Sequence, residues 1–269
     1  MRQLKAEYYK IKYSRASRVI VFFMVLMFFL PFLVGNDTLF MTFGDYRNID
    51  SIGWICYIDD LENIKAAEIS RFALSINFFT WIGLIVYTTS MVLIEFQQGT
   101  IRASVVYGIN RTVLFLSKWL ILNLYYFTLY FIVEVSLGIG LARKYGFHYT
   151  GNEFVVFLGV AFLNMIAMLG MEAIVLVIAI LLKNSGLVTA FACVYFFAGA
   201  ITYPMVYENF ENRSILIKIF CMTNPAMYMY NICGFQISDR LISGTIIYGF
   251  GACLLGVFLM HYILKRQEL

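Results

Sequence analysis

The chain has 269 residues, of which 61% are hydrophobic and 13% are charged. Soluble domains average about 45–50% apolar and about 25% charged residues, and the mean hydropathy here is +0.79. These values exclude a soluble enzyme and a disordered tail. The net charge of +4 is small and dispersed along the chain, whereas nucleic-acid binding needs a clustered basic face, so we expect no nucleic-acid partner.

The first 18 residues are polar but patterned. Leu4, Tyr8 and Ile11 recur at helical spacing, with Lys5 and Lys12 beside them. This pattern predicts an amphipathic helix over residues 1–18 that lies in the inner membrane interface, with its basic side chains toward anionic lipid. The alternative is a basic tail that only directs membrane topology.

Six apolar stretches are long enough to cross a bilayer core, which takes about 20 helical residues. Their continuous apolar runs indicate helices, because the strands of a membrane barrel would alternate with period two. A signal peptide is the competing interpretation of residues 1–35, but Leu33-Val34-Gly35 lacks the small residues of a cleavage site. The predicted spans are 19–34, 72–94, 119–142, 154–182, 187–205 and 245–264.

The positions of lysine and arginine predict the orientation of these spans. With the N-terminus inside, the cytoplasmic side carries 12 basic and 3 acidic residues, and the outer side carries 8 basic and 11 acidic ones. We therefore expect both termini to be cytoplasmic. The residues after the amphipathic helix, 19–269, then form one six-helix transmembrane domain.

The inner loop at 95–118 contains a short segment between two glycines. Gly99 and Gly108 bracket eight residues, enough for two helical turns of about 12 Å, and glycine allows a sharp backbone turn at each end. Asn110 is positioned to cap the helix that continues into the third span. The loop therefore predicts a short rigid helix on the inner face of the membrane that a soluble partner can bind. The alternative is an ordinary basic loop.

The outer segment at 207–244 contains two apolar runs, 215–222 and 226–235, that are too short to span a membrane. Thr223, Asn224 and Pro225 separate them. We predict a re-entrant or interfacial segment with its break at Asn224 and Pro225, facing a vestibule or another helix.

Two carboxylates, Glu134 and Glu172, fall within predicted spans. Because a buried charge in a bilayer is expensive, such residues suggest a functional role. Asn77 and Asn164, with Asn123, are lesser polar partners for a translocation path. The alternative is that each carboxylate is a hydrogen-bonded packing device.

Several motifs are missing from the sequence. There is no phosphate-binding G-x-x-x-x-G-K-[ST] loop, no H-E-x-x-H and no G-x-S-x-G. His148 and His261 lie far apart, and no Cys/His metal spacing occurs. We therefore expect no enzyme activity, no catalytic or metal site and no cofactor bound by this chain.

The combination of these features resembles the ABC-2 type permeases of bacterial ABC exporters. The inner loop carries the nearest match, similar to the E-x-x-x-G-T and G-x-x-R-x-x-x-x-x-K patterns of that family. The matching residues are Glu95, Gly99, Thr100, Arg102, Gly108, Arg111 and Lys118.

The resemblance implies a bacterial plasma-membrane pore made by two six-helix protomers, as a homodimer or with a paired permease. Each protomer would be seated on a separate cytoplasmic ATPase that binds ATP and Mg²⁺. It also implies that the inner loop is a coupling helix that docks in the ATPase. The residues that would form or frame it are Glu95, Gly99, Thr100, Arg102, Gly108 and Arg111.

The cargo is expected to be hydrophobic or amphipathic: an antimicrobial peptide, a bacteriocin in self-immunity, or a drug. A polysaccharide or teichoic-acid exporter is the alternative within the family. From other classes, Asn224-Pro225-Ala226 suggests an aquaporin-like channel, but the second such tripeptide and the following arginine are missing. A proton-coupled carrier that uses Glu134 and Glu172 is the other alternative.

Overall fold

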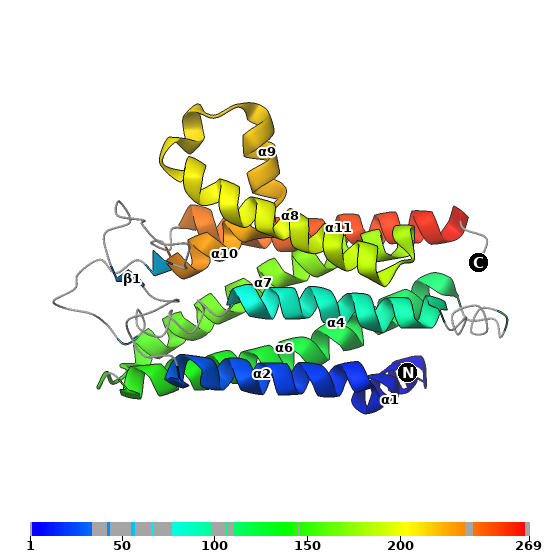
Figure 1. The fold of residues 1–269 in the computed structure, drawn as a ribbon, viewed down its shortest axis with the longest axis horizontal. Helices are drawn as coiled ribbons and strands as arrows, with labels where there is room; N and C mark the ends of the chain where they lie inside the picture. The colour runs from blue at the N-terminus through cyan, green and yellow to red at the C-terminus, as the bar shows by residue number, and fades with distance from the viewer. Residues whose placement is uncertain are drawn as a thin grey trace.

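The computed structural model describes residues 2–33, 42–43, 55–56, 66, 77–97, 106, 110–144, 146–234 and 239–266. It is a bundle of long helices that run side by side, which confirms the predicted all-α class (Figure 1). Strands β1 (Thr42–Phe43) and β2 (Ile55–Cys56) form one short parallel ladder. The helices are α1 (Arg2–Tyr13), α2 (Arg15–Leu33), α4 (Asn77–Gln97), α6 (Arg111–Lys144), α7 (Gly151–Leu182), α8 (Ser185–Val206), the 3₁₀ helix η2 (Tyr207–Asn212), α9 (Ile215–Thr223), α10 (Pro225–Gly234) and α11 (Asp239–Arg266).

Five of these helices, α4, α6, α7, α8 and α11, are long and apolar enough to cross a membrane. They correspond to the second to sixth predicted spans, so the chain is a multi-pass membrane protein. The first predicted span is helix α2, which has 19 residues and is not among the five. The structure therefore supports five membrane-spanning helices, and a sixth span at α2 stays a prediction.

The helix α2 begins four residues earlier than predicted. Ser14 separates it from α1, and the Ser14 hydroxyl accepts a hydrogen bond from the backbone N–H of Ser17 at 2.9 Å. A serine in this position satisfies a backbone donor that the first helical turn leaves free. The cap explains why Arg15 and Arg18 belong to α2 rather than to the preceding helix.

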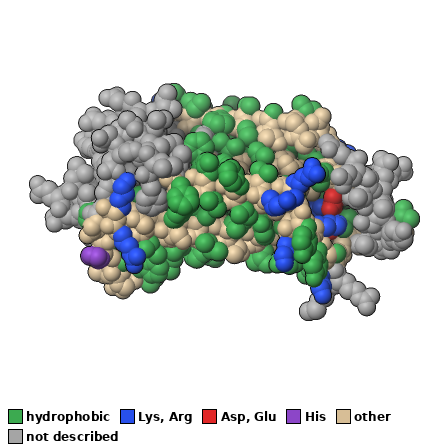
Figure 2. Space-filling model, turned by 60° about the horizontal axis from the view of Figure 1, so that its bottom comes forward, with side chains coloured by type: hydrophobic (Ala, Val, Ile, Leu, Met, Phe, Trp, Pro, Cys, Tyr) green, Lys and Arg blue, Asp and Glu red, His purple; other side chains and the backbone are tan. Residues whose placement is uncertain are grey.

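Both ends of the chain lie at the same end of the bundle, which we call the terminal end (Figure 1). Figure 2 shows hydrophobic side chains in a band along the middle of the bundle, with lysine and arginine at both ends of that band. Basic residues at the borders of an apolar band are typical of a membrane-spanning bundle.

Helix α7 lies at the centre of the fold and packs very closely against α11. A Cβ atom added to Gly249 would lie 2.4 Å from the backbone oxygen of Ile166, and one added to Gly170 would lie 3.0 Å from the Cα of Gly249. One added to Gly256 would lie 3.0 Å from the Cβ of Ala173. Small residues allow such backbone approach between membrane helices, where packing drives association. We call this contact the glycine seam.

The ends of α7 follow from local sequence signals. Thr150 and Glu153 form a capping box at its start, in which each side chain bonds the backbone of the other residue. At its end, Lys183 takes a left-handed conformation with φ of 52°, and the Asn184 side chain accepts the backbone N–H of Leu187 in α8 at 3.2 Å. These two residues reverse the chain direction at the terminal end.

Candidate functional site

At the terminal end of the bundle, helix α1 packs one of its faces against α6 and the neighbouring helices. Ile11 is buried and Leu4 is partly buried in the core that α6 contributes to, as the sequence pattern predicts. The third member of the predicted stripe, Tyr8, is exposed instead. Its place on the buried face is taken by Glu7, which is 2% exposed. A buried carboxylate of this kind requires a partner.

Glu7 belongs to a closed ring of alternating charges that joins three helices. Lys118 of α6 places its Nζ 2.5 Å from Oε2 of Glu95 in α4 and 3.6 Å from Oε2 of Glu7. Lys10 of α1 places its Nζ 2.7 Å from Oε1 of Glu7 and 3.2 Å from Oε1 of Glu95. Each lysine thus bridges both carboxylates. We call these four residues the ionic ring.

The two lysines of the ionic ring differ in environment. The Lys118 side chain is 4% exposed, whereas that of Lys10 is 45% exposed. Burial would lower the pKa of Lys10, but its hydrogen bond with Glu7 and the charge of Glu95 outweigh this effect and raise the pKa above the ordinary value. Lys10 therefore stays protonated at neutral pH, and the charges of the ring balance.

The ionic ring lies at the base of the predicted coupling loop. Glu95 is in the last turn of α4 and Lys118 is in the third turn of α6, so the two helices that flank residues 98–109 are both fastened to α1. Among the predicted coupling residues, Glu95 is buried in this ring. Gly99, Thr100, Arg102 and Gly108 lie outside the described residues. Of the predicted short helix the structure describes Val106 alone, which is helical and exposed.

Arg111 is the first residue of α6. The preceding Asn110 accepts a hydrogen bond from the backbone N–H of Thr112 at 2.9 Å, which confirms the predicted cap. Helix α6 therefore begins eight residues before the apolar stretch that identified it.

Within the bundle, Glu172 of α7 is buried at 1% exposure and faces α4 and α6. Its Oε1 accepts a hydrogen bond from the Thr88 hydroxyl at 3.1 Å, and the Asn123 and Trp119 side chains also face it. Three buried polar atoms here, Glu172 Oε2, Asn123 Oδ1 and Trp119 Nε1, have no hydrogen-bond partner in the described part of the chain. Thr88, Trp119, Asn123 and Glu172 thus form a polar cluster in the interior of the bundle.

The other predicted path residues lie nearer the opposite end. Glu134 of α6 is also 1% exposed, and its Oε2 has no hydrogen-bond partner among the residues that the structure describes. Asn164 of α7 donates from Nδ2 to the Tyr130 hydroxyl at 2.6 Å. Asn77 is the first residue of α4. These positions place Glu134 and Glu172 in the interior of the helix bundle.

The predicted break at Asn224 and Pro225 separates the short helices α9 and α10. Asn224 is fully buried: its Nδ2 donates to the backbone oxygen of Tyr195 in α8 at 2.6 Å, and its Oδ1 accepts the backbone N–H of Ala226 at 2.9 Å. Gly199 makes room for this amide, because a Cβ there would lie 2.1 Å from it. The break therefore faces another helix, which is one of the two predicted environments.

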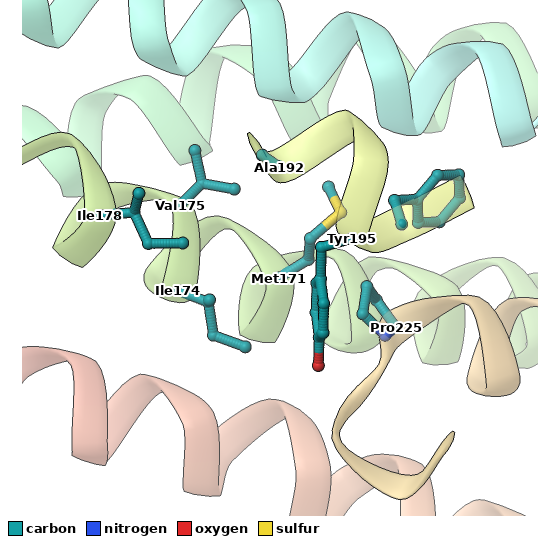
Figure 3. Close-up of a pocket in the computed structure, with 8 residues that line it drawn as sticks. Met171, Ile174, Val175, Ile178, Ala192, Tyr195 and Pro225 are labelled. Carbon is teal, nitrogen blue, oxygen red and sulfur yellow. The ribbon is translucent and has the colours of Figure 1, made fainter. Parts of the chain in front are cut away.

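An apolar hollow lies beside this break, between α7, α8 and Pro225 (Figure 3). Its empty volume of about 260 Å³ includes space that is open to the surroundings, so the enclosed part is too small for a whole cargo molecule. It is lined by Met171, Ile174, Val175, Ile178, Ala192, Tyr195, Phe196 and Pro225.

The comparison with protein families identifies the chain. A family described as ABC-2 family transporter protein matches residues 3–199, from α1 through most of α8. The chain belongs to the ABC-2 transporter family. A search of curated proteins found no match. Membership in the ABC-2 family confirms the resemblance and places this multi-pass protein in the context of ABC transporters, which generally work with an ATPase partner.

The match covers all four residues of the ionic ring, together with Glu134, Glu172 and Asn164. It ends before the break at Asn224. Sequence reasoning missed Glu7, Lys10 and Thr88 as members of these sites. The spacing of Glu7 and Lys10, three residues apart on one helix, was the only local signal. In the described part of the chain, no group of three or more His, Cys, Asp and Glu residues is placed to hold a metal ion.

Proposed function

We propose that this ABC-2 protein is the permease subunit of an ATP-driven exporter in a bacterial plasma membrane. It takes its energy from a separate ATPase subunit, pairs with a second permease protomer and carries no nucleotide or catalytic site of its own. The terminal end is the cytoplasmic end. The observation that carries the proposal is the ionic ring, which fastens both helices that flank residues 98–109 to α1.

The ring gives the coupling loop a stiff base. A push on residues 98–109 from an ATPase would otherwise bend the ends of α4 and α6 separately. Because Lys118 and Glu95 are joined at 2.5 Å and both contact α1 residues, the three helix ends move together. The Thr88–Glu172 hydrogen bond then connects α4 to α7 deeper in the bundle, so the displacement reaches the central helix.

The export cycle follows as a shift between inward-open and outward-open populations of the permease. ATP binding closes the ATPase dimer, moves the loop and favours the outward-open state, because the ATPase binds the two states with different affinity. Asn224 and Pro225 separate the short helices α9 and α10, and the Asn224 side chain bonds this break to the backbone of α8. This break is the part of the outer gate that the cycle has to displace.

The cargo is a hydrophobic or amphipathic molecule, such as a peptide, a bacteriocin or a drug. What supports this class is the apolar surface around α7 and α8, part of which lines the hollow in Figure 3. A polysaccharide or teichoic acid would need a row of hydrogen-bonding groups along its path, so it is the alternative within the family.

The experiment that tests this function separates ATP hydrolysis from transport. In the reconstituted complex, the double variant Gly99→Pro and Arg102→Ala should keep basal ATP hydrolysis but lose substrate-stimulated hydrolysis and export. Arg213→Ala, an exposed residue outside the predicted inner loop, is the matched control and should behave as wild type. Unchanged stimulated hydrolysis and export in the double variant would refute the coupling role.

A proton-coupled carrier is the second candidate. It is favoured by Oε2 of Glu134 and Oε2 of Glu172, which are buried without a hydrogen-bond partner among the described residues. Under this alternative, the purified chain without any ATPase would take up cargo when a pH gradient is imposed on the vesicles. The Glu172→Gln variant would abolish that uptake. Absence of gradient-driven uptake removes this candidate and leaves the ATP-driven function standing.

A further inference from the structure

The face of α1 that points away from the bundle is basic and aromatic. Lys5 and Lys12 are exposed, and three tyrosines beside them, Tyr8, Tyr9 and Tyr13, are 47%, 49% and 68% exposed. The Tyr9 and Tyr13 rings are stacked with their centroids 6.3 Å apart, and Lys12 lies 5.6 Å from the Tyr13 centroid. We call these five residues, with the exposed Arg15 at the start of α2, the basic face.

In the described part of α1 and α2, no exposed acidic residue balances the charge of the basic face. Residues 2–33 contain six lysines and arginines and one acidic residue, a net charge of +5. That acidic residue is Glu7, whose carboxylate is buried in the ionic ring on the opposite side of the helix. The basic face therefore presents an uncompensated positive surface.

The neighbouring residues of α2 indicate the height of the basic face relative to a bilayer. Val19 and Phe22 are 66% and 70% exposed, and in a membrane-spanning bundle such apolar side chains lie within the hydrocarbon region. Arg15 lies within two helical turns of both residues, about 6–11 Å along the helix. The basic face is thus at the level of the phospholipid headgroups, where tyrosine rings also gather.

We propose that the basic face binds the headgroups of anionic phospholipids in the adjacent leaflet, and that the bound headgroups hold α1 seated on the ionic ring. Lys10 makes the connection, because it belongs to the ring and is half-exposed at the edge of this surface. Figure 2 shows lysine and arginine gathered at the terminal end, beside the apolar band. The effect of this lipid on export rests on the proposed function, whereas the binding itself does not.

The binding experiment uses the purified full-length permease without an ATPase. It measures the binding of phosphatidylglycerol and phosphatidylcholine by native mass spectrometry, and the thermal midpoint in micelles doped with either lipid. Phosphatidylglycerol should bind preferentially and raise the midpoint. Each basic residue near an anionic membrane contributes about a fivefold gain in affinity, so Lys5→Gln, Lys12→Gln and Arg15→Gln together should weaken binding about 100-fold.

The matched control is Lys265→Gln with Arg266→Gln, two exposed basic residues at the terminal end that do not contact the ionic ring. This variant should retain the response to phosphatidylglycerol. Equal loss in the triple variant and in this control would overturn the assignment to α1. Glycerol 3-phosphate is a further arm, and a midpoint rise equal to that with phosphatidylglycerol would overturn the assignment to a lipid.

The link to the ionic ring has its own test. Lys118→Met opens the ring from the buried side and leaves the basic face untouched, so this variant should still bind phosphatidylglycerol but gain little thermal stability from it. Full stabilisation in Lys118→Met would overturn the link. Because none of these measurements involves ATP or cargo, a negative result here is distinguishable from a failure of the export function.

Discussion

Replacement of Lys118 by methionine should destabilise the protein far more than the same replacement of Lys10. Methionine keeps the length and apolar part of the side chain but removes the charge. At position 118 the change removes the buried one of the two cations that Glu7 and Glu95 share, and leaves only the half-exposed Lys10 to balance both carboxylates. Loss of one partner from a buried ion pair costs about 3–5 kcal/mol of folding free energy.

At position 10 the expected loss is smaller, because the Lys10 side chain is 45% exposed. Water can solvate the carboxylates in place of the lost ammonium group, and an exposed ion pair contributes about 0–1 kcal/mol to the free energy of unfolding. The measurement is an SDS titration of the purified protein in mixed micelles, followed by circular dichroism. The Lys118→Met curve should shift to much lower SDS than the Lys10→Met curve.

A double-mutant cycle makes the test stricter. Lys118→Met combined with Glu95→Gln removes both charges of the 2.5 Å contact, so the loss should fall short of the sum of the two single losses by about 1–3 kcal/mol. Equal losses for the two lysine variants, or strictly additive losses in the cycle, would refute a buried ionic ring.

Two further predictions concern the bundle interior. The Glu172→Gln variant should fold normally, because its amide oxygen still accepts a hydrogen bond from the Thr88 hydroxyl. The Glu172→Leu variant leaves that hydroxyl unpaired and should lose about 1–3 kcal/mol of folding free energy. Thermal unfolding of the two variants side by side measures the difference. Gly199→Ala should displace the Asn224 amide, which lies 2.1 Å from the added Cβ, and should cost about 1–3 kcal/mol through overpacking. Its control is Gly159→Ala, where the added Cβ meets nothing within 4 Å. Similar melting temperatures for the two glycine variants would contradict the packing of Asn224 against Gly199.

Much of the fold was accessible from the sequence because lipid imposes a simple rule. An apolar run of about 20 residues has to become a helix to satisfy its backbone groups, so the runs ending at Ala142, Leu182 and Leu264 identified α6, α7 and α11. The helix ends were less accessible. Helix α6 extends to Lys144 and begins at Arg111, since polar residues continue a helix beyond the apolar region without changing the hydropathy signal.

The site was only partly accessible, for a different reason. The sequence shows Glu95 and Lys118 as charged residues beside a loop. No local pattern indicates that their other partners, Glu7 and Lys10, lie 85 or more positions away along the chain. Within its own helix, Glu7 is a single acidic residue among lysines, which indicates no role. The ionic ring is a tertiary feature, and pattern reasoning over one helix does not reach it.

The glycine seam also determines which parts of the protein can slide past one another. The backbones of α7 and α11 come into contact at Gly170, Gly249 and Gly256, so a displacement of one of these helices carries the other with it. We therefore expect α7 and α11 to move as one block during the transport cycle.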